Sequence, residues 1–336
     1  MKKLLLLILS GYCFQVMAQM NYPPTRKTDT VTDYHGTKVA DPYRWLEDDR
    51  SEETKAWVTE QNKVTFGYLD KIPYRADWQK RLEAINNYPK YSSPSPKNGY
   101  YYFYKNDGLQ NQSILYRQKG LNGQPEVVLD PNKFSADGTT GLAIFSLSKD
   151  GNHAVVGKTK GGSDWRTLYV MDMRTLTYLP DSIEWVKVSG ASWQKDGFFY
   201  SRYPAPEKGK ELSTKNENHQ VYYHKIGTSQ SADKLVYEDP ANPQRFHGVF
   251  TDETERYVFL NISDRGKGKD GNALWYYDSQ KSQSFQPLIR EAGDYNYGFV
   301  GEENGRFLIL TNDGAKNRRI ISMDPAHPEP ANWTTI

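Results

Sequence analysis

The sequence predicts an all-β fold, a β-propeller of about five four-stranded blades that follows a short helical segment. Short polar turns containing Gly, Asp or Asn recur at intervals of roughly 45 to 57 residues, the period of propeller blades. Aromatic residues make up 14% of the chain, and 25 of them are Tyr, which favours pleated strands over disorder. The five turns lie at 98–99, 150–151, 196–197, 252–255 and 304–305.

The stretch from Phe145 to Asp172 shows the repeating unit. It predicts a strand up to about Leu147, a turn at 149–151, a second strand over 153–158, a polar loop and a third strand over 165–171. An Asp-Gly pair between alternating apolar runs is a strong hairpin signal. Similar strand runs follow the other turns, at 100–104, 198–203, 257–262 and 306–311. A β-sandwich with irregular loops is the alternative, but the regular period favours stacked blades.

The first 18 residues have the pattern of a secretory signal peptide. A basic start, an apolar run over 4–9 and a small-residue site ending at Ala18 precede Gln19. A lipoprotein cleavage at Cys13 is disfavoured because bulky Tyr12 precedes it. Removal of residues 1–18 takes away the single Cys and two Lys, leaving a mature chain of zero formal charge. We therefore expect a periplasmic or secreted protein with no nucleic-acid or membrane partner.

Residues 19–87 predict an N-terminal segment with a hairpin over 28–39 and two helices. Ser51 is an N-cap before Glu52 and Glu53, and the helix ends before Pro73. A second helix covers about 75–86. The helices present apolar faces made by Trp57, Val64, Tyr68 and Leu69, and by Trp78, Leu82 and Ile85. Both faces need a cover, which we expect to be another layer or domain.

Residues 88–336 predict the partial propeller. The final run, 332–336, is aromatic and β-branched, and predicts the opening of a strand without a partner. We therefore expect the natural chain to continue beyond Ile336.

A search for catalytic patterns finds none. The string 161–165 around Ser163 lacks the last Gly of a nucleophile elbow and lies between strands, so it predicts a turn. The six His show no close ligand spacing, which argues against zinc, and no cofactor is indicated. We expect His219 and His224 to be solvated in a polar hairpin. The Gly/Lys-rich run 265–272 predicts a solvated loop between two strands rather than a phosphate site.

Several longer motifs carry a family resemblance. Residues 33–36 read Asp-Tyr-His-Gly, and residues 41–48 read Asp-Pro-Tyr-Arg-Trp-Leu-Glu-Asp. Further motifs follow in order at 88–91, 108–112, 129–132, 162–165, 219–224 and 227–228. Together they resemble the prolyl oligopeptidase family of serine peptidases, and within it prolyl oligopeptidase rather than the dipeptidyl or acylaminoacyl relatives.

The resemblance implies a seven-bladed propeller joined to an α/β-hydrolase domain. About five of the seven blades would be present here, and the two helices would pack on the hydrolase domain. The Ser, Asp and His triad of the family lies after the propeller, so no catalytic residue is assigned in this chain. The propeller of the family admits short peptides and excludes folded proteins.

Two positions match substrate-contacting propeller residues of the family. Phe246 aligns with an apolar residue of the outer substrate pocket, and packing alone is the competing interpretation. Val188 stands where the family has an aromatic residue, so that ring contact is lost.

The sequence therefore predicts the N-terminal and propeller portion of an exported prolyl oligopeptidase, without activity by itself. Its expected partners are short proline-containing peptides and its own hydrolase domain, and we expect a monomer. The alternative is a stand-alone, non-catalytic propeller that binds a small ligand or a protein.

Overall fold

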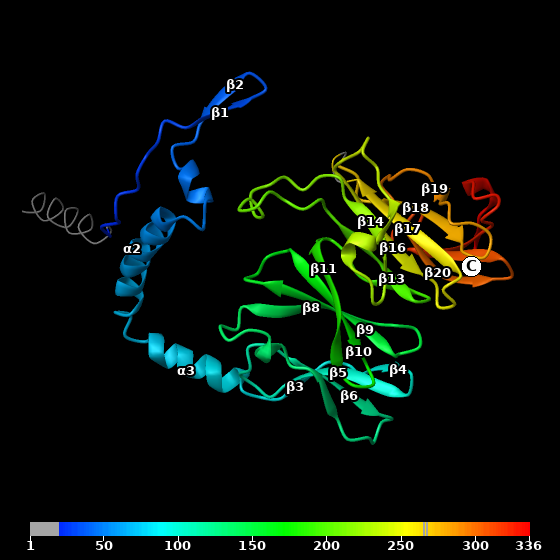
Figure 1. Cartoon of the computed structure of the whole chain (residues 1–336), viewed down its shortest axis with the longest axis horizontal. Helices are drawn as coiled ribbons and strands as arrows, with labels where there is room; N and C mark the ends of the chain where they lie inside the picture. The colour runs from blue at the N-terminus through cyan, green and yellow to red at the C-terminus, as the bar shows by residue number, and fades with distance from the viewer. Residues whose placement is uncertain (1–19, 265, 267) are drawn as a thin grey trace, which may run out of the picture. The chain divides into compact units, whose positions relative to one another are not determined.

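A computed structural model of the chain describes residues 20–264, 266 and 268–336, so the predicted signal peptide lies outside the described residues. The chain divides between Asn87 and Tyr88 into two compact units. In its described residues 20–87, the first unit contains two α-helices and a hairpin, and the described part of the second unit consists of strands with short 3₁₀ turns (Figure 1).

The hairpin of the first unit has the predicted place. Strands β1 (Val31–Tyr34) and β2 (Thr37–Ala40) pair antiparallel around His35 and Gly36, which both have positive φ. Two left-handed central residues are the requirement of a type I′ turn, whose twist matches that of the strands. A 3₁₀ turn, η1 (Arg44–Glu47), leads to the helices.

Both predicted helices form. Helix α2 (Glu52–Leu69) begins after Ser51, whose hydroxyl oxygen accepts the backbone N–H of Thr54 at 3.1 Å. Helix α3 (Arg75–Asn86) follows. Thr54 is the only buried residue of the two helices, which are described in full. The apolar side chains of α3 are exposed, Trp78 by 63%. Over residues 20–87 no apolar side chain is buried, so the helices lack the tertiary packing from which helices gain most of their stability.

The second unit contains five successive groups of antiparallel strands, which we number as blades 1 to 5 (Figure 1). Blade 1 has β3 (Lys90–Tyr91), β4 (Ser95–Lys97), β5 (Tyr100–Asn106), β6 (Ile114–Lys119) and β7 (Glu126–Leu129). Blade 2 has β8 (Thr140–Leu147), β9 (His153–Lys160), β10 (Arg166–Asp172) and β11 (Thr177–Val186). Blade 3 has β12 (Ser192–Gln194), β13 (Gly197–Arg202), β14 (Gln220–Lys225) and β15 (Lys234–Tyr237).

Blade 4 has β16 (Arg245–Thr251), β17 (Tyr257–Asp264), β18 (Asn272–Asp278) and β19 (Gln286–Ile289). Blade 5 has β20 (Tyr297–Glu303), β21 (Arg306–Thr311), β22 (Arg319–Met323) and β23 (Thr334–Thr335). Short 3₁₀ turns η2 (Pro131–Lys133), η3 (Gln230–Ala232) and η5 (Pro330–Asn332) lie in the connections. The predicted β-propeller class is confirmed.

Two details differ from the sequence prediction. Thr334 and Thr335 do have a strand partner, because they pair with β22 as the fourth strand of blade 5. Blades 2 and 3 are also joined into one sheet, through the pairing of Val186 with Arg202. Strand β11 has ten residues, and its last residue reaches the edge of β13.

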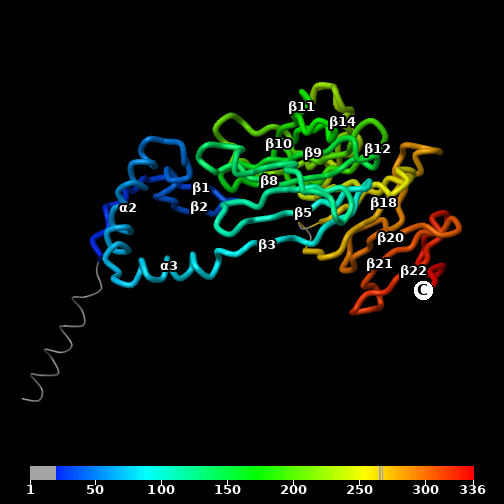
Figure 2. The backbone as a smooth tube through the Cα atoms, turned by 90° about the horizontal axis from the view of Figure 1, so that it is seen from below, coloured from blue at the N-terminus to red at the C-terminus, as the bar shows by residue number. Residues whose placement is uncertain are grey.

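Each pair of consecutive blades shares a hydrophobic cluster. In β9, Ala154 and Val156 pack toward blade 1, whereas Val155 between them packs toward blade 3. This alternation follows from the two-residue period of a strand. Figure 2 shows the backbone trace, in which β5 of blade 1 lies beside β8 of blade 2. The rings of Tyr102 in β5 and Phe145 in β8 make contact between these strands.

The predicted turns gather at one end of the blades, which we call the turn end. The Asn98 side chain donates to the carbonyl of Lys149 at 3.1 Å, which joins the turns of blades 1 and 2. The backbone N–H of Lys195 donates to Glu255 at 2.7 Å, which joins those of blades 3 and 4. The antiparallel register places the start of β16, where Phe246 pairs with Ser263, at the opposite end.

A buried ionic cluster lies between the strands of blades 2 and 3. His224 of β14 holds Asp233 through Nδ1 at 2.7 Å and Asp181 through Nε2 at 2.9 Å, and all three side chains are 0% exposed. Tyr200 donates its hydroxyl to Asp233, and the N–H of Gly227 donates to Asp181. Because ionised carboxylates only accept hydrogen bonds, both ring nitrogens must carry protons, and the ring is a cation.

The pKa of His224 agrees with this geometry. Burial alone would lower the pKa, but the hydrogen bonds to Asp233 and Asp181 outweigh burial and raise it above the ordinary value of 6.5. A raised pKa in the folded state means that protonation stabilises the fold. This contribution is complete below pH 6.5 and is lost as the pH rises through the raised pKa.

We predict that His224→Gln lowers the free energy of unfolding by about 3–5 kcal/mol at pH 6, because it leaves two buried carboxylates without their cation. The difference between wild type and variant should shrink as the pH rises through the raised pKa of His224. Urea denaturation at a series of pH values measures both effects.

The matched control is His327→Gln, since His327 forms a solvent-exposed pair with Asp324 at 3.2 Å. That change should cost less than about 1 kcal/mol, as exposed pairs do. Equal losses for the two variants would contradict the buried-cation interpretation.

Candidate functional site

The site begins at Phe246, the second residue of β16, at the end of blade 4 opposite the turn end. Its half-buried ring meets the imidazole of His219 edge-on, with 5.9 Å between ring centroids and planes at 79°. Edge-to-face contacts of this kind fix the orientation of both rings. Phe246 is therefore held by packing while part of its surface stays accessible.

His219 connects Phe246 to the segment after β11. It precedes β14 and is 1% exposed, and its Nε2 lies 2.9 Å from the carbonyl oxygen of Lys187. Its Nδ1 accepts the backbone N–H of His247 at 2.9 Å, so the proton of the ring resides on Nε2. Burial lowers the pKa of His219 to about 4, although the bond to Lys187 opposes this shift. The ring is neutral at physiological pH.

His247, the residue after Phe246, has a complementary role. Its Nδ1 donates to the carbonyl of His219 at 2.6 Å, and its ring packs against Tyr237. Burial lowers the pKa of His247 as well. In the part of the chain that the structure describes, its buried Nε2 has no hydrogen-bond partner. Two neutral imidazoles thus lock β14 to β16 directly behind Phe246.

The segment after β11 carries unusual backbone conformations. Trp185, the last residue but one of β11, has φ of 62°, and Val188 just after the strand has φ of 51°. Both values lie in the left-handed region, which bulky residues rarely adopt and β-branched residues such as Val avoid. A residue held there costs of order 1–3 kcal/mol and persists only where the surroundings enforce it. Val188 is 49% exposed and lines a cavity of about 290 Å³ that Gly248 of β16 also lines.

The structure therefore brings the two residues predicted from the sequence to neighbouring places. Phe246 touches His219, His219 binds the carbonyl beside Val188, and the cavity extends from Val188 to Gly248. Phe246 and Val188 supply apolar surface, the cavity wall also contains Ser189 and Ser201, and both imidazoles are neutral. Such a surface can bind an apolar or planar group, but it offers no poised acid or base.

The expectation that His219 and His224 are solvated was wrong. Both are buried, at 1% and 0% exposure, and each ring has hydrogen-bond partners on other segments of the chain. The partners of His224 stand 43 and 9 residues away, at Asp181 and Asp233, so the local polar pattern of the hairpin could not reveal them. The burial pattern of β14 does not alternate either, since its buried residues Val221 and His224 are three positions apart.

The other candidate segments have the predicted setting. Ser163 lies in the loop between β9 and β10, and accepts the N–H of Trp165 through its own hydroxyl. The Gly/Lys-rich run lies between β17 and β18, with residues 265 and 267 outside the described part. Over residues 20–264, 266 and 268–336, no group of three or more His, Cys, Asp or Glu side chains could hold a metal ion. No helix within these residues has the length and apolar content needed to cross a membrane.

Comparisons with known proteins agree with this architecture. Residues 23–336 match the family described as prolyl oligopeptidase, N-terminal beta-propeller domain. The prolyl endopeptidase of Elizabethkingia miricola is 39% identical over 340 residues, which cover 99% of this chain and 48% of the relative. The prolyl endopeptidase of Elizabethkingia meningoseptica is 41% identical over 318 residues, which cover 94% of this chain and 44% of the relative. The chain spans about half the length of these curated relatives.

Solved structures give the same result. A structure from a study of two prolyl endopeptidases matches with a TM-score of 0.82 at 30% identity, over 94% of this chain and 46% of that one. Prolyl oligopeptidase B of Galerina marginata, bound to a 25-residue macrocyclization substrate, matches with a TM-score of 0.79 at 29% identity, over 94% and 47%. The chain belongs to the prolyl oligopeptidase family, and its similarity covers the N-terminal β-propeller domain of that family.

Proposed function

We propose that the chain is the N-terminal and propeller portion of an exported prolyl oligopeptidase, a serine endopeptidase that cleaves short peptides after proline. The observation that carries the proposal is the family match over residues 23–336, together with curated relatives named prolyl endopeptidases. In this proposal the propeller restricts access to short peptides, and the hydrolase domain supplies the chemistry.

The chemistry of the buried histidines supports a non-catalytic role for the propeller. Both ring nitrogens of His219 and of His224 are engaged in hydrogen bonds. His247 has a free Nε2, but no serine hydroxyl donates to it within the described residues. A serine nucleophile needs a base within hydrogen-bond reach, and none of these three rings provides one.

The exposed helix faces support a domain partner for the first unit. Trp78, Leu82 and Ile85 lie three or four positions apart on α3 and are all exposed. An amphipathic helix buries such a stripe against another element. We assign this cover to the hydrolase domain of the same protein, as in the family resemblance.

The intact mass and location of the native gene product test the proposal. We expect a species about twice the length of this chain, beginning at Gln19, in the periplasm or the culture medium. A stable product of about this length would instead favour a stand-alone propeller, and a cytoplasmic product that retains Met1 would contradict export.

The chain alone should not hydrolyse a proline-containing chromogenic peptide. The expected rate equals that of buffer, because the triad of the family lies outside the propeller. Hydrolysis that rises with chain concentration and is stopped by a serine-directed organophosphorus reagent would refute this prediction.

We predict that Phe246→Ala in the native product raises KM for peptides that extend several residues before the proline by about tenfold, the loss expected of about 1.4 kcal/mol of contact. The kcat of a minimal dipeptide chromogen should stay unchanged, because that substrate ends short of the propeller. Leu121→Ala, at a position 70% exposed in the turn after β6, is the control. Equal effects on both substrates would indicate a packing role for Phe246.

A further inference from the structure

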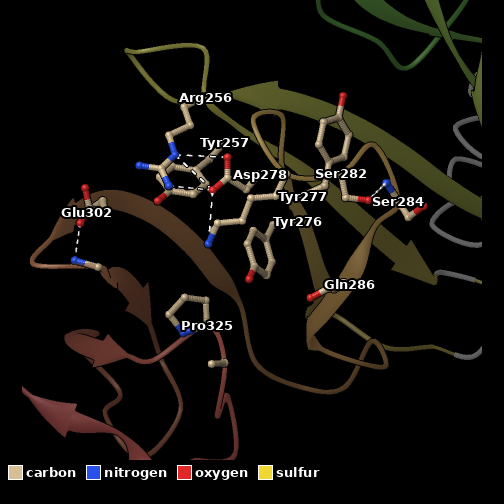
Figure 3. Close-up of a pocket in the computed structure, with 13 residues that line it drawn as sticks. Arg256, Tyr257, Tyr276, Tyr277, Asp278, Ser282, Ser284, Gln286, Glu302 and Pro325 are labelled. Atoms are coloured by element: carbon tan, nitrogen blue, oxygen red, sulfur yellow. Dashed lines mark hydrogen bonds and ion pairs between the residues drawn. The ribbon is translucent and has the colours of Figure 1, made fainter.

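A second cavity, of about 430 Å³, lies between blades 4 and 5 at the turn end (Figure 3). Its wall includes Arg256 and Tyr257 at the start of β17, Asp278 at the end of β18 and Glu302 near the end of β20. The antiparallel register of β16 and β17 places it at the end of blade 4 opposite Phe246. It is therefore separate from the site described above.

The floor of this cavity is a fixed ion pair. Arg256 donates to Asp278 from Nε at 3.2 Å and from Nη2 at 2.7 Å, and its guanidinium carbon stands 4.7 Å from the ring centroid of Tyr257. The side chain of Asp278 is only 8% exposed, and the Arg256 hydrogen bond lowers its pKa. Bidentate pairing and ring stacking hold the guanidinium in one orientation. Its Nη1 donates to no residue among those that the structure describes.

The phenol ring of Tyr276 also lines the cavity. Figure 3 shows the ring of Tyr276 below Asp278, on the side toward Pro325 and Gln286. An edge-to-face contact with Phe307, at 5.0 Å between centroids, fixes this ring. Within residues 20–264, 266 and 268–336, the Tyr276 hydroxyl has no hydrogen-bond partner, so it can donate to a ligand and accept from one.

Two groups of opposite charge line the cavity. Lys281 is 79% exposed, and its ammonium nitrogen is 3.9 Å from Asp278, a long contact that leaves its protons available. Glu302 accepts the backbone N–H of Gly305 through one oxygen, which leaves its second oxygen for another donor. The hydrogen bond to Asp278 is the main cause that raises the pKa of the Arg256 guanidinium, and the charge of Glu302 adds to it.

We propose that this cavity binds a short peptide with free ends, the α-ammonium at Glu302 and the α-carboxylate at Lys281 and Arg256. Free amino and carboxyl groups on one ligand match the two charges, and the Tyr276 hydroxyl can bond the peptide backbone between them. The cavity volume lies within the range of small-molecule sites. A neutral sugar would leave both charges without a counterpart, and an inorganic ion would use only one.

This site goes beyond the proposed peptidase role, since it stands at the opposite end of the blade and does not depend on cleavage. Titration calorimetry of the intact chain with triglycine tests it directly. We expect saturable 1:1 binding, weakened at least about tenfold when either end of the peptide is capped, by N-acetylation or by C-amidation, because each charged hydrogen bond contributes more than 1 kcal/mol.

Two variants assign the ends. Glu302→Gln should weaken triglycine binding about tenfold and remove the effect of N-acetylation. Lys281→Met should also weaken binding and should reduce the effect of C-amidation, because Arg256 remains to bind the carboxylate. Glu303→Gln is the matched control, because Glu303 is the exposed neighbour of Glu302 and does not line the cavity. Phe246→Ala should also bind triglycine normally, which keeps this test distinct from that of the proposed function.

Absence of saturable binding up to about 10 mM triglycine, well above the Kd of millimolar complexes, would overturn the proposal. Equal affinity for free and capped peptides would overturn it too, as would equal losses in Glu302→Gln and Glu303→Gln. Circular dichroism of each variant confirms the fold, and since Glu302 and Lys281 are exposed, both variants should match the wild type.

Discussion

The propeller depends on strands of the inner blades whose two faces pack toward different neighbouring blades. In β13, Phe198 and Tyr200 pack toward blade 2, whereas Phe199 between them packs toward blade 4. A slip of one residue in register would exchange these two sets and bury the wrong side chains on both sides. A substitution in one blade therefore also affects its neighbour, since each hydrophobic cluster is shared by two consecutive blades.

Two further interactions join blades 2 and 3, in addition to their shared hydrophobic cluster. The pairing of Val186 with Arg202 makes their sheet continuous, and the Asp181–His224–Asp233 cluster adds buried charge beside it. Burying charges is costly, and replacing them by apolar groups often stabilises a protein. The hydrogen bonds of this cluster depend on direction. An imidazolium with a carboxylate on each nitrogen accepts only one arrangement of β11, β14 and the η3 turn. We infer that the cluster specifies how these two blades meet.

Much of this fold could be predicted from local sequence. The turn at Asn304-Gly305 forms where expected because both residues accept positive φ, and α2 begins where Ser51 offers a cap. Local patterns could not reveal partners from distant strands. The local sequence predicts that His224 is solvated, and only the structure shows Asp181 beside it. The cavity of Arg256 and Glu302 likewise forms only where blades 4 and 5 pack together. Phe246 was identified through family resemblance, while its support by His219 required the structure.

The two ends of blade 4 have different chemistry and lie one strand length apart. Strand β16 has seven residues, so its ends are roughly 20 Å apart at 3.4 Å per residue. At the Phe246 end, burial holds His219 and His247 neutral, and the surface is aromatic. At the turn end, Arg256 pairs with Asp278 and Glu302 accepts the backbone N–H of Gly305, so the surface there is polar. A ligand selected by charge would therefore favour the turn end, and one selected by shape and apolar contact would favour the Phe246 end. Tyr257 and Tyr276 of the turn-end cavity also pack in the core that joins blades 4 and 5, so the packing of these two blades fixes the aromatic part of that cavity.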